Sequence, residues 1–343
     1  MRTHGMSRRH LLQATVGAAS VLAAPHIARA AAAPLVIYDS LDFVGKAAKA
    51  FSAKTGIATN VVEQGGTGGV LGKIAAEGDK PQYDMVWLEG SAVMERMAQA
   101  GIFGAHADLA ARAAYTKVGR SLVPASAMFL PVTASTTGIT VNSKKLTPAQ
   151  YPKSWSDLAN PDYAGAIAAK DPNLSGPAFQ WLAGFFQAMG EEKGKALLLQ
   201  VLTNKALSGL PSGGTVNKAL LTGNAKLAIT QDSATFGKIA AGEPLVSLYP
   251  TEGVVATPSS IGISARTTQA DSCHQFVSFV LSPEGQAAML DGDDSDFFFA
   301  PIIEGVKAKP GRTTDINFLV LDNAAAAKNE TAWKSWYREN FVP

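Results

Sequence analysis

The chain has 343 residues, 47% of them hydrophobic, which is enough to fill the cores of about two domains. This composition excludes a disordered, collagen-like or disulfide-stapled chain. The formal net charge is +2, but four arginines lie in an N-terminal segment that resembles a removable leader and contains no acidic residue. Without that segment the net charge is about −2. The protein therefore lacks the basic surface that nucleic acids or anionic membranes would require.

The leader, residues 1–30, has a basic start, an apolar stretch at 11–24 and an Ala-Arg-Ala end. We expect cleavage after Ala30, with Ala33 as the second choice. The segment SRRHLL at 7–12 resembles a twin-arginine signal, and a Sec leader with two arginines is the alternative. Because the apolar stretch is shorter than the roughly 20 residues that span a bilayer, we expect an exported protein of the periplasm.

Strand-like and helix-like segments alternate after the leader. Strands are predicted at 35–38, 58–63 and 83–87, and helices at 42–54, 70–77 and 92–100. A glycine-rich segment at 65–69 is predicted to be a loop. It lacks the third glycine of a dinucleotide-binding motif and the Ser or Thr of a phosphate loop, which makes a nucleotide an unsuitable ligand. Three strand–helix units in succession indicate an open, mostly parallel α/β sheet.

The segment 129–141 consists of two β-rich pieces broken by a small, hydroxyl-rich centre, and it is predicted to be a crossing to a second α/β domain. The elements expected beyond it are helices at 178–189, 191–202 and 216–221, a strand at 227–230, a return strand at 259–264, and helices at 274–281 and 333–341. Two crossings between two α/β lobes imply a hinge.

Five blocks carry a family resemblance. They are WSDLANPDYAG at 155–165, DPNLSG at 171–176, SGGTV at 212–216, YPTEG at 249–253 and FVSFVLSPEGQ at 276–286. In order and spacing they resemble the periplasmic solute-binding proteins of ABC importers, in the branch shared by ferric-iron, phosphonate, sugar-phosphate and polyamine binders. The resemblance implies a two-lobed type II periplasmic-binding-protein fold, with two open α/β sheets joined by a two-strand hinge. We expect lobe 1 at 31–133 and 263–343, lobe 2 at 134–262, and a ligand cleft between them.

Two predicted helix starts in lobe 2 are candidate anion sites. Free backbone N–H groups and the helix dipole favour an oxyanion there, and hydroxyls add donors. The candidate residues are Ser175, Gly176, Ser212, Gly213, Gly214 and Thr215. The alternative is that Ser175 and Ser212 are ordinary helix N-caps.

Lobe 1 supplies candidates at the carboxyl edge of its predicted strands, where open α/β sheets bind ligands. Ser40 follows the first strand, or caps the next helix, and the amides of Thr67 and Gly68 face the cleft, or only form a turn. Glu89 contacts ligand or hinge, with an exposed acid as the alternative. By the resemblance, Asp232 in lobe 2 contacts the ligand and pairs with an amine or hydroxyl.

Metal and catalytic signals are sparse. His106 and His274, the histidines outside the leader, have no companion ligands, and ferric binders use adjacent tyrosines where this chain has Gln-Asp-Ser at 231–233. The acidic run at 291–296 lacks the pattern of a calcium loop and is predicted to be a solvated loop. Cys273 is the single cysteine of the sequence, which excludes an internal disulfide, and we expect it in the core. We therefore expect no cofactor, no metal site and no enzyme activity.

These observations predict a monomeric periplasmic receptor that captures a small anionic solute, preferably a phosphonate or phosphate ester, by hinge closure. Its expected partners are a membrane ABC permease and its ATPase. The alternative within transport is a ferric or other metal complex. From other classes, an exported α/β hydrolase or transferase and a ligand-sensing module remain open.

Overall fold

The computed structural model describes residues 33–343, so the predictions for the leader lie outside the described residues. Residues 34–343 form one compact unit. Within the described residues, no helix combines the length and the apolar character needed to cross a membrane.

The first lobe begins with the three expected strand–helix units. They are β1 (Leu35–Asp39), α1 (Val44–Thr55), β2 (Thr59–Glu63), α2 (Thr67–Glu77), β3 (Met85–Glu89) and α3 (Ser91–Gln99). β1 lies between β2 and β3 and is parallel to both. The predicted loop at 65–69 is shorter than expected, because α2 already begins at Thr67. Gly66 makes the turn into that helix at φ 135°, a backbone conformation that residues with a Cβ atom rarely adopt.

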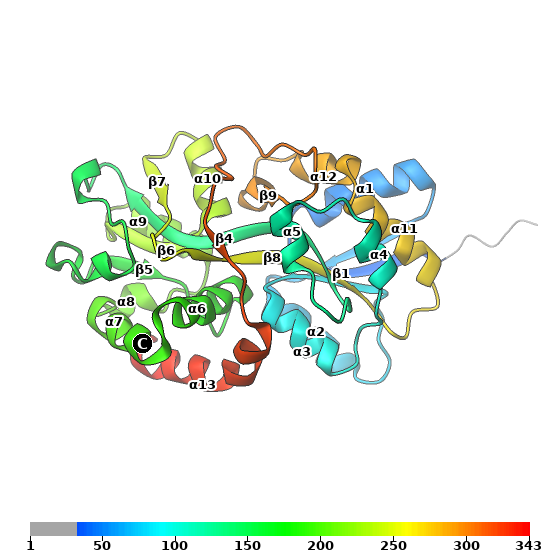
Figure 1. The fold of residues 1–343 in the computed structure, drawn as a ribbon, viewed down its shortest axis with the longest axis horizontal. Helices are drawn as coiled ribbons and strands as arrows, with labels where there is room; N and C mark the ends of the chain where they lie inside the picture. The colour runs from blue at the N-terminus through cyan, green and yellow to red at the C-terminus, as the bar shows by residue number, and fades with distance from the viewer. Residues whose placement is uncertain (1–32) are drawn as a thin grey trace, which may run out of the picture. The chain divides into compact units, whose positions relative to one another are not determined.

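Two long strands pass from one lobe to the other. β4 (Leu130–Asn142) and β8 (Val254–Ile263) are antiparallel and buried along their whole length. Figure 1 shows them side by side across the middle of the fold. The predicted break within 129–141 is absent: the hydroxyl-rich centre continues the strand, with only a register shift between Pro131 and Thr133. Strand β8 likewise begins five residues before the predicted start.

The strands form one continuous hydrogen-bonded path, in the order β2-β1-β3-β8-β4-β6-β5. Its middle is antiparallel, unlike the mostly parallel sheet that we expected. The reason is that the chain leaves the first lobe through β4 and returns through β8 in the opposite direction. Along this path the parallel pairs are confined to the outer strands of each lobe.

The second lobe packs helices around β5 (Ile167–Ala169), β6 (Leu227–Gln231) and β7 (Leu245–Leu248). Its helices are α6 (Gly176–Met189), α7 (Glu191–Val201), α8 (Lys205–Ser208), α9 (Gly213–Leu221) and α10 (Asp232–Ala240). The core of this lobe contains the rings of Trp155, Trp181 and Phe185. A separate core, with Phe51, Trp87 and Phe276, fills the first lobe.

The other α-helices and strands lie between α3 and β4 or follow the return strand β8. They are α4 (Ala107–Arg112), α5 (Lys117–Leu122), α11 (Ala270–Val280), α12 (Pro283–Leu290), β9 (Ala300–Pro301), β10 (Phe318–Leu319) and α13 (Asn323–Phe341). The lobe boundaries at 133/134 and 262/263 stay predictions. However, the helix α13 packs in the core of the second lobe, because its buried rings Trp333, Tyr337 and Phe341 join the cluster around Trp181.

Candidate functional site

A cleft of about 300 Å³ lies between the strand ends of the first lobe and the helix starts of the second. Five of the predicted site residues line it: Ser40, Thr67 and Glu89 from the first lobe, and Ser175 and Ser212 from the second. They come from segments up to 172 residues apart, so the fold brings together what the sequence could only place at separate strand and helix ends.

Three helices start at this cleft, namely α2, α6 and α9. The hydroxyl of Ser175 accepts a hydrogen bond from the Ala178 amide at 3.4 Å, and that of Ser212 accepts one from the Thr215 amide at 3.2 Å. Both serines are therefore N-caps, as the alternative interpretation held, and both also line the cleft. The remaining free amides of the first turns favour an anionic group.

The other predicted residues lie around the cleft rather than on its wall. Gly68 and Gly176 line a small adjoining pocket of about 50 Å³, and Gly213 lines another pocket of similar size. Gly214 and Thr215 belong to the first turn of α9 and are not among the residues that line the cleft.

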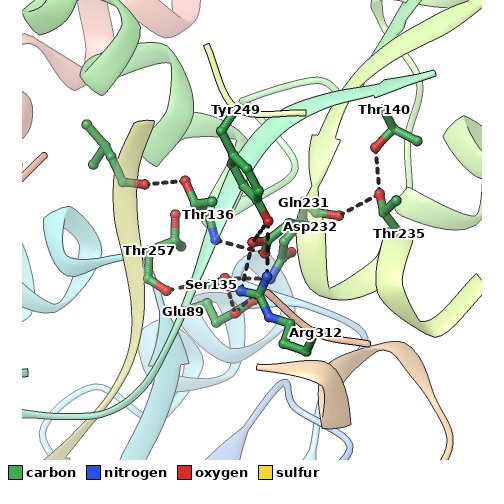
Figure 2. Close-up of polar contacts among 11 residues, drawn as sticks. Glu89, Ser135, Thr136, Thr140, Gln231, Asp232, Thr235, Tyr249, Thr257 and Arg312 are labelled. Carbon is green, nitrogen blue, oxygen red and sulfur yellow. Dashed lines mark hydrogen bonds and ion pairs between the residues drawn. The ribbon is translucent and has the colours of Figure 1, made fainter. Parts of the chain in front are cut away.

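Asp232 is not a cleft residue, which corrects our expectation of a ligand contact. Its side chain is fully buried and forms an ion pair with Arg312, Oδ2 to Nη2 at 2.7 Å (Figure 2). The Thr136 amide and the Tyr249 hydroxyl donate to the two carboxylate oxygens at 3.0 Å. Burial raises the pKa of Asp232, and the Arg312 guanidinium opposes that rise. The carboxylate therefore links α10 to the crossing strand β4 instead of facing solute.

Several cleft residues were missed by the sequence analysis. They are Asp42, Glu63, Lys170, Gln231 and Asp296, with Leu174, Pro177 and Pro211 as apolar contacts. Gln231 directly precedes Asp232 at the end of β6, so the strand-end rule could have found it. Asp296 belongs to the run at 291–296 that we expected to be solvated. No local signal placed it beside Asp42, whose amide donates to it at 3.2 Å.

Glu89 is the carboxylate at the junction of the lobes. Its Oε1 accepts hydrogen bonds from Gln231 Nε2 at 2.8 Å and from the Ser135 hydroxyl at 3.2 Å (Figure 2). Burial raises the pKa of Glu89 to about 8, with a further contribution from the nearby charge of Asp296. One side chain thus contacts the first lobe, the crossing strand and the second lobe together.

The cleft combines opposite charges. Lys170 is its cation, and burial lowers the pKa of this ammonium while Glu89 and Asp296 act in the opposite direction. Burial also raises the pKa of Asp296 to about 6. Four carboxyl groups and one ammonium therefore line the same space as three helix N-termini. Such a site suits a solute that has an oxyanion at one end and hydroxyl or amino groups elsewhere.

Among residues 33–343, no group of three or more His, Cys, Asp or Glu side chains is placed to hold a metal ion. His106 and His274, far apart in sequence, do lie together, with Nδ1 and Nε2 3.0 Å apart. Tyr249 is the tyrosine beside the Gln-Asp-Ser segment, and its hydroxyl is engaged by Asp232 and Arg312.

Two α/β lobes joined by two crossing strands, with a polar cleft between them, define a two-lobed solute-binding protein. The pattern of the bacterial extracellular solute-binding proteins matches residues 81–329, more than two thirds of the chain, and the chain belongs to that family. The chain is 29% identical over 255 residues to an uncharacterised protein of Haemophilus influenzae, covering 72% of each. It is 21% identical to the phosphoglycerate transport regulatory protein PgtC of Salmonella typhimurium, over 69% of this chain and 58% of that protein.

Solved structures have the same fold. The periplasmic binding protein AfuA of Actinobacillus pleuropneumoniae, with fructose-6-phosphate bound, superposes with a TM-score of 0.77 at 22% identity, over 90% of this chain and 98% of AfuA. Iron-bound HitA of Pseudomonas aeruginosa superposes with a TM-score of 0.76 at 23% identity, over 90% and 99%. These likenesses confirm the predicted two-lobed type II fold.

Proposed function

We propose that this protein is the periplasmic receptor of an ABC importer and captures a small phosphate ester or phosphonate by closure of its two lobes. The observation that supports this best is the convergence of three helix N-termini and Lys170 on one cleft. Helix starts and a partly buried ammonium stabilise oxyanions. We further propose that the receptor is a monomer and that it delivers the solute to a membrane permease and its ATPase.

The carboxyl groups of the cleft narrow the class of solute. A bare phosphate offers no donor to the carboxyl oxygens of Glu89 and Asp296, whereas the hydroxyl or amino groups of an organic solute can donate to them. The role that we expected for Asp232 thus falls to Glu89, with Gln231 beside it. Sugar phosphates and aminoalkyl phosphonates meet both requirements. Two relatives support this class of solute: AfuA has fructose-6-phosphate bound, and PgtC is named as a phosphoglycerate transport regulatory protein.

A ferric complex is the second candidate. Iron in HitA favours it, and the four cleft carboxyl groups offer acceptors to a preformed complex, since no three of them among the described residues are placed to hold a bare metal ion. An exogenous anion at the helix starts would complete such a complex. An exported enzyme would instead need a nucleophile and a base within hydrogen-bond reach in the cleft.

A thermal-shift screen of protein that has been unfolded and refolded to strip bound solute tests the proposal. The panel contains glycerol 3-phosphate, fructose-6-phosphate, 2-aminoethylphosphonate, inorganic phosphate, ferric citrate, a polyamine and a neutral sugar. A solute at 1,000 times its Kd adds about 4 kcal/mol of stability, which is several degrees in Tm. Stabilisation by the organic phosphates or phosphonates supports the proposal, and stabilisation by ferric citrate alone replaces it with the second candidate. No stabilisation by any compound favours a sensor or an enzyme.

A further inference from the structure

A small pocket opens from the second-lobe wall of the cleft. This side pocket, defined by Thr137, Lys170, Trp181, Gly213 and Thr230, has a volume of about 50 Å³. It shares Lys170, Ser175, Pro177 and Gln231 with the cleft. One water-sized atom needs about 10–15 Å³ of such volume, so the pocket has room for roughly four. That is the size of a tetrahedral oxyanion.

Trp181 is the unusual residue of this side pocket. Its indole is 4% exposed, and none of the described residues accepts a hydrogen bond from its Nε1–H. By contrast, Trp155 Nε1 in the same core donates to the Gly253 carbonyl at 3.3 Å. Buried N–H groups are seldom left without an acceptor, and an indole N–H can only donate. Because Trp181 lines the side pocket, a solute acceptor bound there is a candidate partner for this N–H.

The rest of the lining also consists of donors. Lys170 has no carboxylate within 4.0 Å among the described residues, so its ammonium is available. Helix α9 begins at Gly213, and the cap on Ser212 engages the Thr215 amide, which leaves the Gly213 amide free. The hydroxyls of Thr137 and Thr230 can donate as well. No carboxyl group lines the side pocket, whereas four line the cleft beside it.

We propose that the side pocket is the subsite for the oxyanion of the solute, with Trp181 Nε1–H and Lys170 Nζ as its donors. This inference rests on the proposed function and deepens it. The phosphate or phosphonate group enters the side pocket, and the remaining part of the solute extends across the cleft toward Glu89. A charged oxygen there gains a hydrogen bond from an indole that is already buried, so binding adds no desolvation cost for that donor.

The indole N–H resonance of Trp181 in a proton–nitrogen spectrum is a direct test. The chain has five tryptophans, and the resonance missing from Trp181→Phe identifies the signal. Glycerol 3-phosphate and 2-aminoethylphosphonate are the probes. The proposal expects this resonance to move downfield when either probe binds. In Trp181→Phe the affinity should fall about tenfold or more, because a hydrogen bond to a charged group is lost.

Trp336→Phe is the matched control, since Trp336 lies on α13 and packs against Phe186. It should keep wild-type affinity. Lys170→Gln serves as a second variant in case Trp181→Phe does not fold, and it too should lose at least tenfold. Binding of a probe with an unmoved Trp181 resonance and wild-type affinity in the variants overturns the subsite alone. If neither probe binds the wild-type protein, the proposed function fails and the subsite fails with it.

Discussion

A Cβ atom on Gly176 would lie 2.6 Å from the backbone carbonyl oxygen of Glu89. The same atom would come within 3.0 Å of Thr67 Oγ1. Glu89 and Thr67 belong to the first lobe and Gly176 to the second, so the backbones of the two lobes touch where α6 begins. The missing side chain of Gly176 therefore sets how closely the lobes approach each other in this conformation.

We predict that Gly176→Ala weakens solute binding. Overpacking costs about 1–3 kcal/mol, which is roughly 5- to 150-fold in affinity, and we expect this strain to develop as the lobes close on solute. The unfolding midpoint of the solute-free protein should stay near that of the wild type. Titration calorimetry and urea unfolding measure the two quantities.

Gly214→Ala is the matched control for this substitution. Gly214 also lies in the first turn of a cleft helix, but a Cβ atom there would meet only Ser212 Oγ at an ordinary 3.7 Å. Its affinity should match that of the wild type. Equal losses in both variants would show that the effect is not caused by lobe approach.

The buried ion pair of Asp232 and Arg312 predicts a large stability loss on breaking it. Both side chains are 0% exposed, and Arg312 also lies over the Phe236 ring at 4.7 Å. Arg312→Met should destabilise the protein by about 3–5 kcal/mol, because Asp232 is left as an unpaired buried charge. In Arg112→Met the lost partner is Asp108 in an exposed pair, and the expected loss is below about 1 kcal/mol. Similar losses for both arginines in urea unfolding would refute this.

We predict that the free energy of unfolding falls as the pH rises, because of Glu89. Burial raises its pKa to about 8 in the folded protein from an ordinary value of 4.5. The folded state therefore holds the proton more tightly, and the contribution is complete below about pH 4.5 and lost as the pH rises to about 8. Urea unfolding at pH 5, 6, 7 and 8 should show a smaller decline for Glu89→Gln than for the wild type. Glu284→Gln, at an exposed position, should keep the wild-type slope, and a wild-type slope in Glu89→Gln would contradict the prediction.

Cys273 should be inert in the folded protein. Its thiol is fully buried, and burial raises its pKa to about 12, so little thiolate exists at neutral pH. We expect no reaction with a disulfide reagent at pH 8 on the time scale of minutes, and complete reaction in guanidinium chloride. Rapid labelling of the native protein would place the thiol at the surface instead.

Much of the fold follows from periodicity. Strands β1 to β3 and helices α1, α6 and α7 lie close to their predicted ranges. Each has a regular apolar pattern, so the local sequence is enough to predict it. The continuity of β4 did not follow from its sequence. Its small hydroxyl residues resemble a loop, yet they are buried because Thr133 and Thr136 hydrogen-bond to strand β8, which only the tertiary fold brings alongside.

The site was predictable where it lies at strand and helix ends. Ser40, Ser175 and Ser212 were found by that rule. Asp296 and Lys170 were not, since their place in the cleft depends on how distant segments fold back. The predicted ligand contact of Asp232 was wrong for a related reason. Its partner Arg312 is 80 residues away in sequence, and no local pattern around Asp232 indicates a buried ion pair.

The aromatic side chains of α13 complete a core whose other buried members, apart from Leu321 and Ala326, lie at Val255 or earlier in the chain. A ribosome releases the chain from its N-terminus, so the apolar face around Trp181 stays uncovered until Phe341 has emerged. During synthesis that face is open to chaperones, to proteases and to other nascent chains. A premature stop codon near the end of the gene would therefore leave a protein with an exposed half-core rather than a slightly shorter receptor.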